Sequence, residues 1–481
     1  MDEKLGGLGH ILTTVFLSSF AGFLVRPVMT DVTVAAVCSE LNDSCSLAVY
    51  LTGVQQVVIT STYIYVHIGR SLSLFPIFNL QSLPFSVGLG TMVMMPVIGN
   101  LADRYGIKAL LTLPMCLSII PPDRNKGGLE MVLGYRRDTL FFYTYYVIKI
   151  IFDMVCQGTV DCLAQAYVAK NIHGTQRISM FGVLAGVRSI SAVCATFAAR
   201  FLPTASTFQV TALSLFVGLV YMRIFLKERL HDDDEDDYDG GGDERVLTEP
   251  ILENAPTRTH VFYNKYSSLK DMVALMKNST ILVQALAVTF FVTFSQSGME
   301  SAFLNIILHG FKKNDFAQLS LLVWIIGSVS QLFILRILVS AIGERRVLST
   351  GLLMDFFNAA ILSVSWSPWV PYAATALVPG VMFVMPSIYG IASRQVRSAE
   401  QGKVQGCIYG VNSFAEVVAP FVYSPLTALF LSDNAPFYFP GFSLLCIALS
   451  LMIGFLLSLL IKDVPSSLMK KTISSASNEE A

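Results

Sequence analysis

Long uncharged segments alternate with short charged clusters along almost the whole chain. Most of these segments are about 20 residues long or longer, the length that an α-helix needs to cross the hydrocarbon core of a bilayer. The pattern therefore predicts an all-α membrane protein with twelve transmembrane helices in two six-helix bundles. The predicted helices occupy residues 8–29, 46–100, 107–122, 139–169, 178–201, 205–226, 280–305, 316–340, 346–366, 369–393, 403–430 and 437–461.

A polar segment separates the sixth predicted helix from the seventh. It contains an unbroken acidic run at 232–237, followed by three glycines at 240–242. Such a run repels itself and cannot bury apolar surface, so we expect a disordered linker. A calcium-binding loop is the alternative, but contiguous acids lack the alternating spacing of such a loop. The predicted domains are an N-terminal bundle at 1–226, a cytoplasmic linker at 227–277, a C-terminal bundle at 278–465 and a cytoplasmic tail at 466–481.

The composition favours a membrane protein over a soluble one. The chain is 53% hydrophobic and 14% charged, whereas a soluble domain usually carries about 25% charged residues. The net charge of −1 argues neither for nor against a nucleic-acid partner, but the sequence has no basic patch with interleaved aromatic residues, and we predict no such partner. The six histidines are scattered without metal-ligand spacing, and no nucleotide motif or catalytic triad stands out. We therefore predict no metal, no cofactor and no enzymatic activity, and a lipid bilayer as the surroundings.

The sharpest local signal is a charged turn at residues 99–106, Gly-Asn-Leu-Ala-Asp-Arg-Tyr-Gly, followed by Ile107 and Lys108. Uncharged sequence flanks it on both sides, so the chain is predicted to turn there at a membrane surface. Gly99 allows close packing of one helix end, and Gly106 permits a turn without steric cost. Asp103 lies within a turn of the next helix's positive N-terminus, where a carboxylate is favourable.

The distribution of Lys and Arg predicts that both termini are cytoplasmic. Arg104, Lys108 and the basic residues of the linker fall on that side, whereas Lys312 and Lys313 are exceptions. The apolar segment near the N-terminus is interpreted as the first membrane helix, because it lacks a suitable cleavage site for a signal peptide. The predicted location is the plasma membrane or an endomembrane.

Cys38 and Cys45 flank a polar loop on the opposite side of the membrane. A disulfide between them is possible if this side is oxidising. The glycosylation sequon at Asn42 in the same loop agrees with that placement.

Two stretches fit the helix pattern badly. Residues 46–100 are too long for one crossing, and two crossings would move the charged turn to the other side. We therefore predict that 57–85 is an insertion, and likewise the Pro- and Gly-containing stretch 121–131, with a genuine outside loop as the alternative.

The order of these features resembles the major facilitator superfamily of secondary transporters. The six-plus-six helices, the central polar linker and the pattern Gly-x-Leu-x-Asp-Arg-x-Gly-x-Lys at 99–108 carry the resemblance. The stretches 51–56, 108–114 and 206–210 are similar to the branch that contains tetracycline-efflux and hippocampus-abundant-transcript-like proteins, with a plant-type character.

The resemblance implies an alternating-access carrier whose solute binds near the midplane between the two bundles. It also implies that Asp103 reaches the start of helix eleven, around Gly402 and Lys403, and latches the bundles in one state. The corresponding C-terminal stretch at 343–346 is only a fragment of the pattern.

Ionisable residues at membrane depth are costly and are candidates for function. Asp153, Arg188, Asp355 and Glu416 lie near the middle of their predicted helices. The polar residues of the fourth helix are spaced four apart and form one stripe, which by the resemblance faces the solute path. The predicted solute or proton path comprises Lys149, Asp153, Gln157, Asp161, Arg188, Glu300, Asp355, Asn412 and Glu416.

Structural alternatives apply to several of these residues. Lys149 and Asp153 could simply form an ion pair within one helix, and Arg188 could pair with Asp153. Glu416 could be a proton carrier or a protonated packing residue, and Glu300 could touch water at the outer end of its helix.

The chain departs from the family at two positions. Met154 stands where the helix-four pattern has arginine, and Val187 stands where the helix-five antiporter pattern has proline. Neither proton antiport nor drug efflux is therefore carried over. We predict a monomeric, proton-coupled secondary transporter of a small organic solute. The alternatives are a transport-inactive receptor or scaffold of the same fold, or a splice variant with impaired folding.

Overall fold

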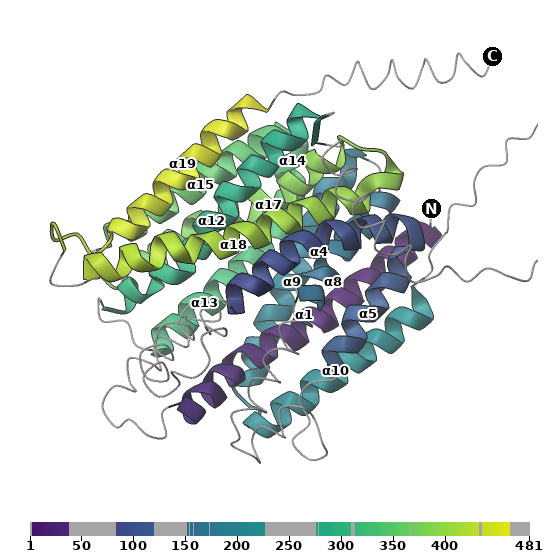
Figure 1. The fold of residues 1–481 in the computed structure, drawn as a ribbon, viewed down its shortest axis with the longest axis horizontal. Helices are drawn as coiled ribbons and strands as arrows, with labels where there is room; N and C mark the ends of the chain where they lie inside the picture. The colour runs from purple at the N-terminus through teal and green to yellow at the C-terminus, as the bar shows by residue number, and fades with distance from the viewer. Residues whose placement is uncertain are drawn as a thin grey trace, which may run out of the picture.

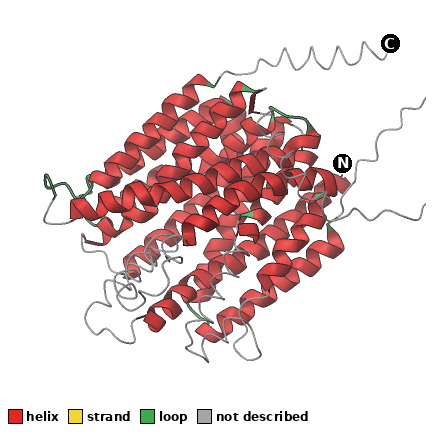
Figure 2. Cartoon of the chain, viewed as in Figure 1, coloured by secondary structure: helices red, strands yellow, loops and turns green. Residues whose placement is uncertain are grey.

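The structure is a computed structural model of the full chain. It describes residues 2–37, 83–119, 152, 154–156, 158–172, 174–226, 276–277, 279–308, 313–365, 367–431 and 435–461. All regular secondary structure in these residues is helical (Figure 2).

Several predicted features lie wholly or largely outside the described residues. These are the Cys38–Cys45 loop with Asn42, the predicted insertions 57–85 and 121–131, nearly all of the linker, the tail from 466, and the helix-four residues Lys149, Asp153 and Gln157.

The first half of the chain contributes long helices that begin with α1 (Asp2–Val37). They continue with α4 (Leu83–Tyr105), α5 (Ile107–Ile119), α8 (Thr159–Asn171), α9 (Arg177–Ala199) and α10 (Thr204–Phe225), with the short 3₁₀ turn η3 (Gly174–Gln176) before α9.

The second half contributes α12 (Thr280–Leu308), α13 (Lys313–Val329), α14 (Leu335–Ile342), α15 (Glu344–Ser363), α16 (Val370–Ala374), α17 (Val378–Ser393), α18 (Gln401–Leu431) and α19 (Phe442–Leu460). Shorter turns link some of them. A π-helical turn η4 (Ser330–Ile334) joins α13 to α14, and 3₁₀ turns η5 (Thr375–Leu377) and η6 (Ser398–Glu400) precede α17 and α18.

The all-α membrane fold is confirmed. Each of the twelve predicted ranges contains helix, and six helices of the described part are long and apolar enough to span a bilayer. Large apolar side chains stay exposed on helices of both halves, among them Leu213 and Phe216 of α10, Phe333 of η4 and Ile337 of α14. On helices of this length such side chains suit contact with lipid tails.

The helices lie side by side in one bundle (Figure 1). Within the first half α1 packs against α9 and α10, and within the second half α15 packs against α17 and α19. The two halves meet where α4 packs along α18 and where α9 packs against α13 and α17. One buried cluster belongs to both halves, since it contains Leu8 and Phe181 from the first and Leu282, Tyr389 and Val404 from the second.

The fourth predicted helix differs from its sequence-based interpretation. The range 139–169 was predicted as one helix, but α8 begins only at Thr159, after Gly158 at φ +74°. Glycine tolerates this left-handed conformation without a Cβ clash. The helix is therefore interrupted within the predicted span, which places Asp161 in the first turn of α8.

Candidate functional site

The predicted contact of Asp103 with helix eleven is present. Asp103 lies in the last turn of α4, and its Oδ1 accepts the Gly402 N–H at 2.9 Å while its Oδ2 accepts the Lys403 N–H at 3.0 Å. Both donors lie in the first turn of α18, where backbone N–H groups lack partners within the helix and the helix dipole favours negative charge. Asp103 thereby joins the two halves at one end of the bundle, which we call the Asp103 end.

Burial raises the pKa of the Asp103 carboxyl from 3.8 to about 6, although the two backbone hydrogen bonds act in the opposite direction. The desolvation cost of the charged form therefore exceeds what the two hydrogen bonds return. Asp103 lies beyond residue 100, where the predicted span ends.

Three glycines allow α4 and α18 to approach closely enough for this contact. A Cβ on Gly99 would lie 2.1 Å from the carbonyl oxygen of Gly402, and one on Gly402 would lie 2.4 Å from that of Gly99. A Cβ on Gly406 would lie 2.5 Å from the carbonyl oxygen of Met95. The obstacles are backbone atoms, which no rotamer change can move. Gly106 has φ +90°, so the turn predicted at this glycine is also present.

A second set of contacts joins the halves at the same end. Arg394, just after α17, donates to the carbonyl of Gly174 at 2.9 and 3.2 Å and forms an ion pair with Glu344. In the reverse direction, Arg177 at the start of α9 donates to the carbonyl of Ser393 at 2.8 Å. Each half thus holds a backbone carbonyl of the other with an arginine, and we call these contacts the arginine clamp.

Glu344 belongs to the fragmentary C-terminal counterpart of the charged turn at 99–106. It follows Gly343 at φ +85°, as Ile107 follows Gly106 at φ +90°. Burial raises the pKa of Glu344 from 4.5 to about 7, while Arg394 acts to lower it. The first half therefore uses a carboxylate that accepts from the start of α18, and the second uses a carboxylate that holds an arginine against the carbonyl before α9.

A further charged contact is an ion pair within the first half, between α8 and α9, and Tyr389 and Tyr409 of the second half are electrostatic neighbours of its arginine. Arg188, near the middle of α9, places its Nη1 2.8 Å from Oδ2 of Asp161. The side chains keep 43% and 21% of their exposure, respectively. A charged pair with this much accessible surface is not enclosed in a packed core. The alternative contact of Arg188 with Asp153 falls outside the described residues.

Aromatic side chains from four helices surround Arg188. The Phe23 ring of α1 has its centroid 6.0 Å from Cζ of Arg188, and Phe23 meets Trp324 of α13 edge to face with 5.4 Å between centroids. Tyr389 of α17 and Tyr409 of α18 are further electrostatic neighbours of the guanidinium. The wall around Arg188 is therefore built from both halves.

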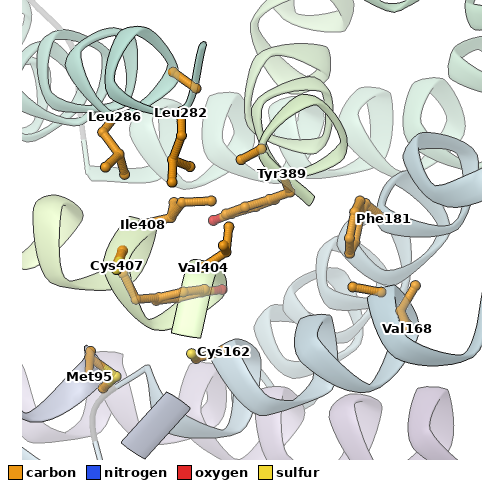
Figure 3. Packing of buried hydrophobic residues seen from close by; sticks show 14 of the residues in the cluster. Met95, Cys162, Val168, Phe181, Leu282, Leu286, Tyr389, Val404, Cys407 and Ile408 are labelled. Atoms are coloured by element: carbon orange, nitrogen blue, oxygen red, sulfur yellow. The ribbon is translucent and has the colours of Figure 1, made fainter. Parts of the chain in front are cut away.

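An aromatic layer separates this pair from the Asp103 end. The rings of Tyr389 and Tyr409 stack with 6.0 Å between centroids, and Phe181 meets Tyr389 edge to face at 6.0 Å. Gln165, one turn after Asp161, donates to the Tyr409 hydroxyl at 3.2 Å. Figure 3 shows Phe181 and Tyr389 approaching from different helices, with Val404 and Cys407 of α18 and Cys162 of α8 nearby. The layer joins side chains of both halves.

The layer contains polar atoms without partners. Among the described residues, the buried Oε1 of Gln165 has no hydrogen-bond partner, nor do the side-chain amide atoms of Gln405, one turn before Tyr409 on the same face of α18. Unpaired buried polar atoms are costly, so these amides are available to water or to a solute.

The structure brings only some of the predicted path residues together. Glu416 is exposed on α18 and is an electrostatic neighbour of Arg188. Asn412 accepts a hydrogen bond from Thr293 of α12 at 2.8 Å. Asp355 is only 3% exposed and lies in α15, which packs against α17 and α19 of its own half. Glu300 lies in α12, but its side chain is outside the described part.

Two glycines of the incomplete helix-five pattern pack between the halves. A Cβ on Gly182 would lie 2.4 Å from Leu335, and one on Gly186 would lie 2.7 Å from Leu332. Next to Arg188, Ser189 donates to Oε1 of Gln331 in the π-helical turn η4 at 2.9 Å. Turns of this kind occur often at functional sites.

The sequence-based interpretation missed the arginine clamp and the aromatic layer. Neither Arg394 nor Tyr389 was among the residues predicted for the solute or proton path or for the latch. The one available signal was the acid beside Gly343 in the fragmentary C-terminal motif. Within the described residues, no group of three or more His, Cys, Asp or Glu side chains is placed to hold a metal ion.

The fold and the central ion pair define an integral, multi-pass α-helical membrane protein. The sequence model of the Major Facilitator Superfamily matches residues 139–420, more than half of the chain. The chain belongs to this family of transporters, which confirms the resemblance seen in the sequence.

Named relatives agree with this assignment. The chain is 22% identical to the Tetracycline resistance protein, class B, of Escherichia coli over 76% of this chain and 82% of that protein. It is 26% identical to the human Hippocampus abundant transcript-like protein 1 over 34% of this chain and 32% of that one.

Solved structures share the fold. The human organic anion transporter MFSD10 (TETRAN) superposes with a TM-score of 0.65 at 15% identity, covering 95% of this chain and 99% of that one. The outward conformation of the transporter FucP gives a TM-score of 0.61 at 11% identity, covering 96% and 100%.

Proposed function

We propose that the protein is a proton-coupled secondary active transporter that moves a small organic solute by alternating access. The observation that carries this proposal is the ion pair of Asp161 and Arg188, two residues of the first half whose electrostatic neighbours include side chains of the second half. Ionised groups at membrane depth are expensive and usually mark the path of a solute or an ion. The partial exposure of both side chains supports a role in binding, because a purely structural pair gains nothing from open space beside it.

The contacts at the Asp103 end provide the moving part of the mechanism. Asp103, the arginine clamp and the aromatic layer hold the halves together on one side of the ion pair. In a rocking-bundle mechanism these contacts break so that the solute can leave on that side. Apart from the aromatic layer, these contacts are hydrogen bonds and one ion pair, which suits a closure that must open reversibly.

Protons are the proposed coupling ion, and Asp161 is their proposed carrier. Protonation of Asp161 would release Arg188, so that the charge of the site changes with the proton. Two related folds are described as a fucose:proton symporter and a proton:xylose symporter. Their descriptions support proton coupling as the first mechanism to test here.

The orientation is proposed from the charge pattern. Arg104, Lys108, Arg394 and Lys403 gather near the Asp103 end, and the positive-inside rule assigns that end to the cytoplasm. The structure then corresponds to a state closed to the cytoplasm. The protein is proposed to act as a monomer in the plasma membrane or an endomembrane.

The test is solute flux through the full-length protein in liposomes with an imposed pH gradient. We expect the wild type to accumulate at least one solute of a metabolite panel only when the gradient is present. Asp161→Asn should still equilibrate that solute but lose its accumulation by at least about tenfold, since the carboxyl no longer exchanges a proton. Asp315→Asn, at the start of α13, is the matched control and should behave as wild type.

Two results would overturn this proposal. If no solute moves through the correctly folded wild type, the protein is a transport-inactive receptor or scaffold. If Asp161→Asn accumulates solute as the wild type does, proton coupling does not pass through this pair.

A further inference from the structure

Asp161 occupies only part of the hydrogen-bonding capacity of the Arg188 guanidinium. The ion pair employs Nη1, whereas a guanidinium carries five N–H donors in a rigid, planar fork. Within the described part of the chain, Asp161 is the one acceptor at hydrogen-bond distance from Arg188. Since 43% of the side chain is exposed, against 21% for Asp161, the charged surface presented to the space is mainly positive.

An apolar wall continues from the guanidinium. Phe23 offers a ring face to Arg188, and Trp324 meets Phe23 edge to face at 5.4 Å. One ring comes from each half, so a flat apolar group against them would contact both halves at once. Aromatic pairs of this kind bind rings with a preferred geometry.

Among the described residues, the other charged and titratable groups around Arg188 are Asp161 of α8, Tyr389 of α17, and Tyr409 and Glu416 of α18. The tyrosine hydroxyls can donate to an anion, whereas Glu416 repels one placed beside it. The favourable position for an anion is therefore the part of the guanidinium that Asp161 leaves unoccupied, beside the Phe23 ring, which we call the open edge of Arg188.

We propose that the transported solute is an organic anion whose carboxylate binds the open edge of Arg188 and whose ring-bearing part packs on Phe23 and Trp324. This inference rests on the proposed transport function and names its substrate class. A carboxylate matches the guanidinium fork through two parallel N–H···O bonds, a geometry that a lysine ammonium does not reproduce.

Binding can be measured without transport, as ligand-induced thermal stabilisation of the detergent-solubilised full-length protein. The probes are benzoate, 1-naphthoate and indole-3-carboxylate at millimolar concentration, each compared with its neutral amide and its primary amine. We expect the carboxylates to raise the unfolding temperature of the wild type and the amides and amines to leave it unchanged. A ligand that binds the folded state stabilises it by mass action.

Variants then assign the effect to the site. Arg188→Lys should weaken carboxylate binding by at least tenfold, because the bidentate geometry is lost, and Trp324→Ala should weaken naphthoate more than benzoate. Removing Arg188 alone leaves Asp161 unpaired and risks misfolding, so the double variant Arg188→Gln with Asp161→Asn removes both charges and should lose the carboxylate effect. Arg200→Gln, at the exposed end of α9, removes a positive charge elsewhere and should bind as wild type.

Stabilisation by the amines, no stabilisation by any carboxylate, or full carboxylate binding in the double variant would each overturn the substrate class. These failures differ from failure of the transport proposal. If carboxylates bind at Arg188 but no solute is transported, the binding site is supported and the transport proposal is wrong. If the pH gradient drives flux of an amine, transport is supported and the proposed anion site is wrong.

Discussion

At the scale of single residues, Asp103 has the most clearly defined task, because each carboxylate oxygen accepts one backbone N–H of the other half. Asp103→Ala leaves both N–H groups without their acceptor in the closed state, and an unsatisfied buried donor costs about 1–3 kcal/mol. Asp103→Ala should therefore lower the closed population of the Asp103 end by at least about tenfold.

The native cysteines report this opening. Cys407 is 2% exposed and lies behind the closure, whereas Cys194 is exposed on α9. Maleimide modification followed by mass spectrometry should show faster reaction of Cys407 in Asp103→Ala, with Cys194 unchanged. Tyr105→Ala, at a 64% exposed position two residues away, is the control. If Cys407 reacts at the same rate in Asp103→Ala as in wild type, Asp103 does not contribute to the closed state.

The ion pair of Arg188 marks how far single residues could be predicted. The four-residue spacing on the fourth helix indicated a polar stripe, and Asp161 was one of its members. Which residue pairs with Arg188 depends on how α8 and α9 are rotated against each other, which residue spacing alone does not determine. Asp355 looked equivalent by its depth in a helix, but depth does not distinguish a residue between the halves from one buried within a half.

At the scale of helices, the contact of α4 with α18 depends on glycines, whose lack of a Cβ lets the two backbones approach closely. Gly99→Ala places a Cβ against the carbonyl of Gly402, which can be relieved only by moving a helix. Overpacking of this kind costs about 1–3 kcal/mol. We expect the unfolding temperature of the detergent-solubilised protein to fall by at least about 2 °C.

The matched control for this change is Gly9→Ala. Gly9 lies in α1, where an added Cβ meets nothing within 4 Å, and alanine has the higher helix propensity. Its unfolding temperature should stay the same or rise slightly. A loss as large as that of Gly99→Ala would show that any methyl group in these helices is harmful and that the α4–α18 contact is not special.

Helices and their turns were predictable where one short segment holds the whole pattern. Gly99, Asp103 and Gly106 lie within eight residues, so their joint role could be inferred before the fold was known. The arginine clamp could not be inferred in this way. Its partners are far apart in sequence, and the acceptors are backbone carbonyls of Gly174 and Ser393, which have no signature in a sequence.

At the scale of the whole molecule, the clamp predicts a rank order among variants. Arg394→Gln loses the charge that holds both Glu344 and the carbonyl of Gly174. Glu344→Gln keeps the bonds between Arg394 and Gly174 and loses only the ion pair. We therefore expect Cys407 to react faster in Arg394→Gln than in Glu344→Gln. The reverse order would mean that the ion pair, and not the contact between the halves, holds this end closed.

The closure as a whole should also depend on pH, because burial raises the pKa of Asp103 to about 6 and that of Glu344 to about 7. In the open state these carboxyls meet water and titrate near their ordinary values of 3.8 and 4.5. Between about pH 4 and 7 the closed state therefore binds more protons than the open one. Lowering the pH through this window favours closure, and raising it favours opening, with no further change above about pH 8.

The distance between spin labels on Tyr105 and Arg397, exposed positions on opposite halves at this end, tests the sign. The long-distance fraction should grow as the pH rises from 4 to 7 in wild type. It should stay constant in the double variant Asp103→Asn with Glu344→Gln, since neither amide titrates. A long-distance fraction that shrinks with rising pH would mean that the hydrogen bonds to the charged form of Asp103 outweigh its desolvation. The carboxylates would then fasten the two halves together only when ionised.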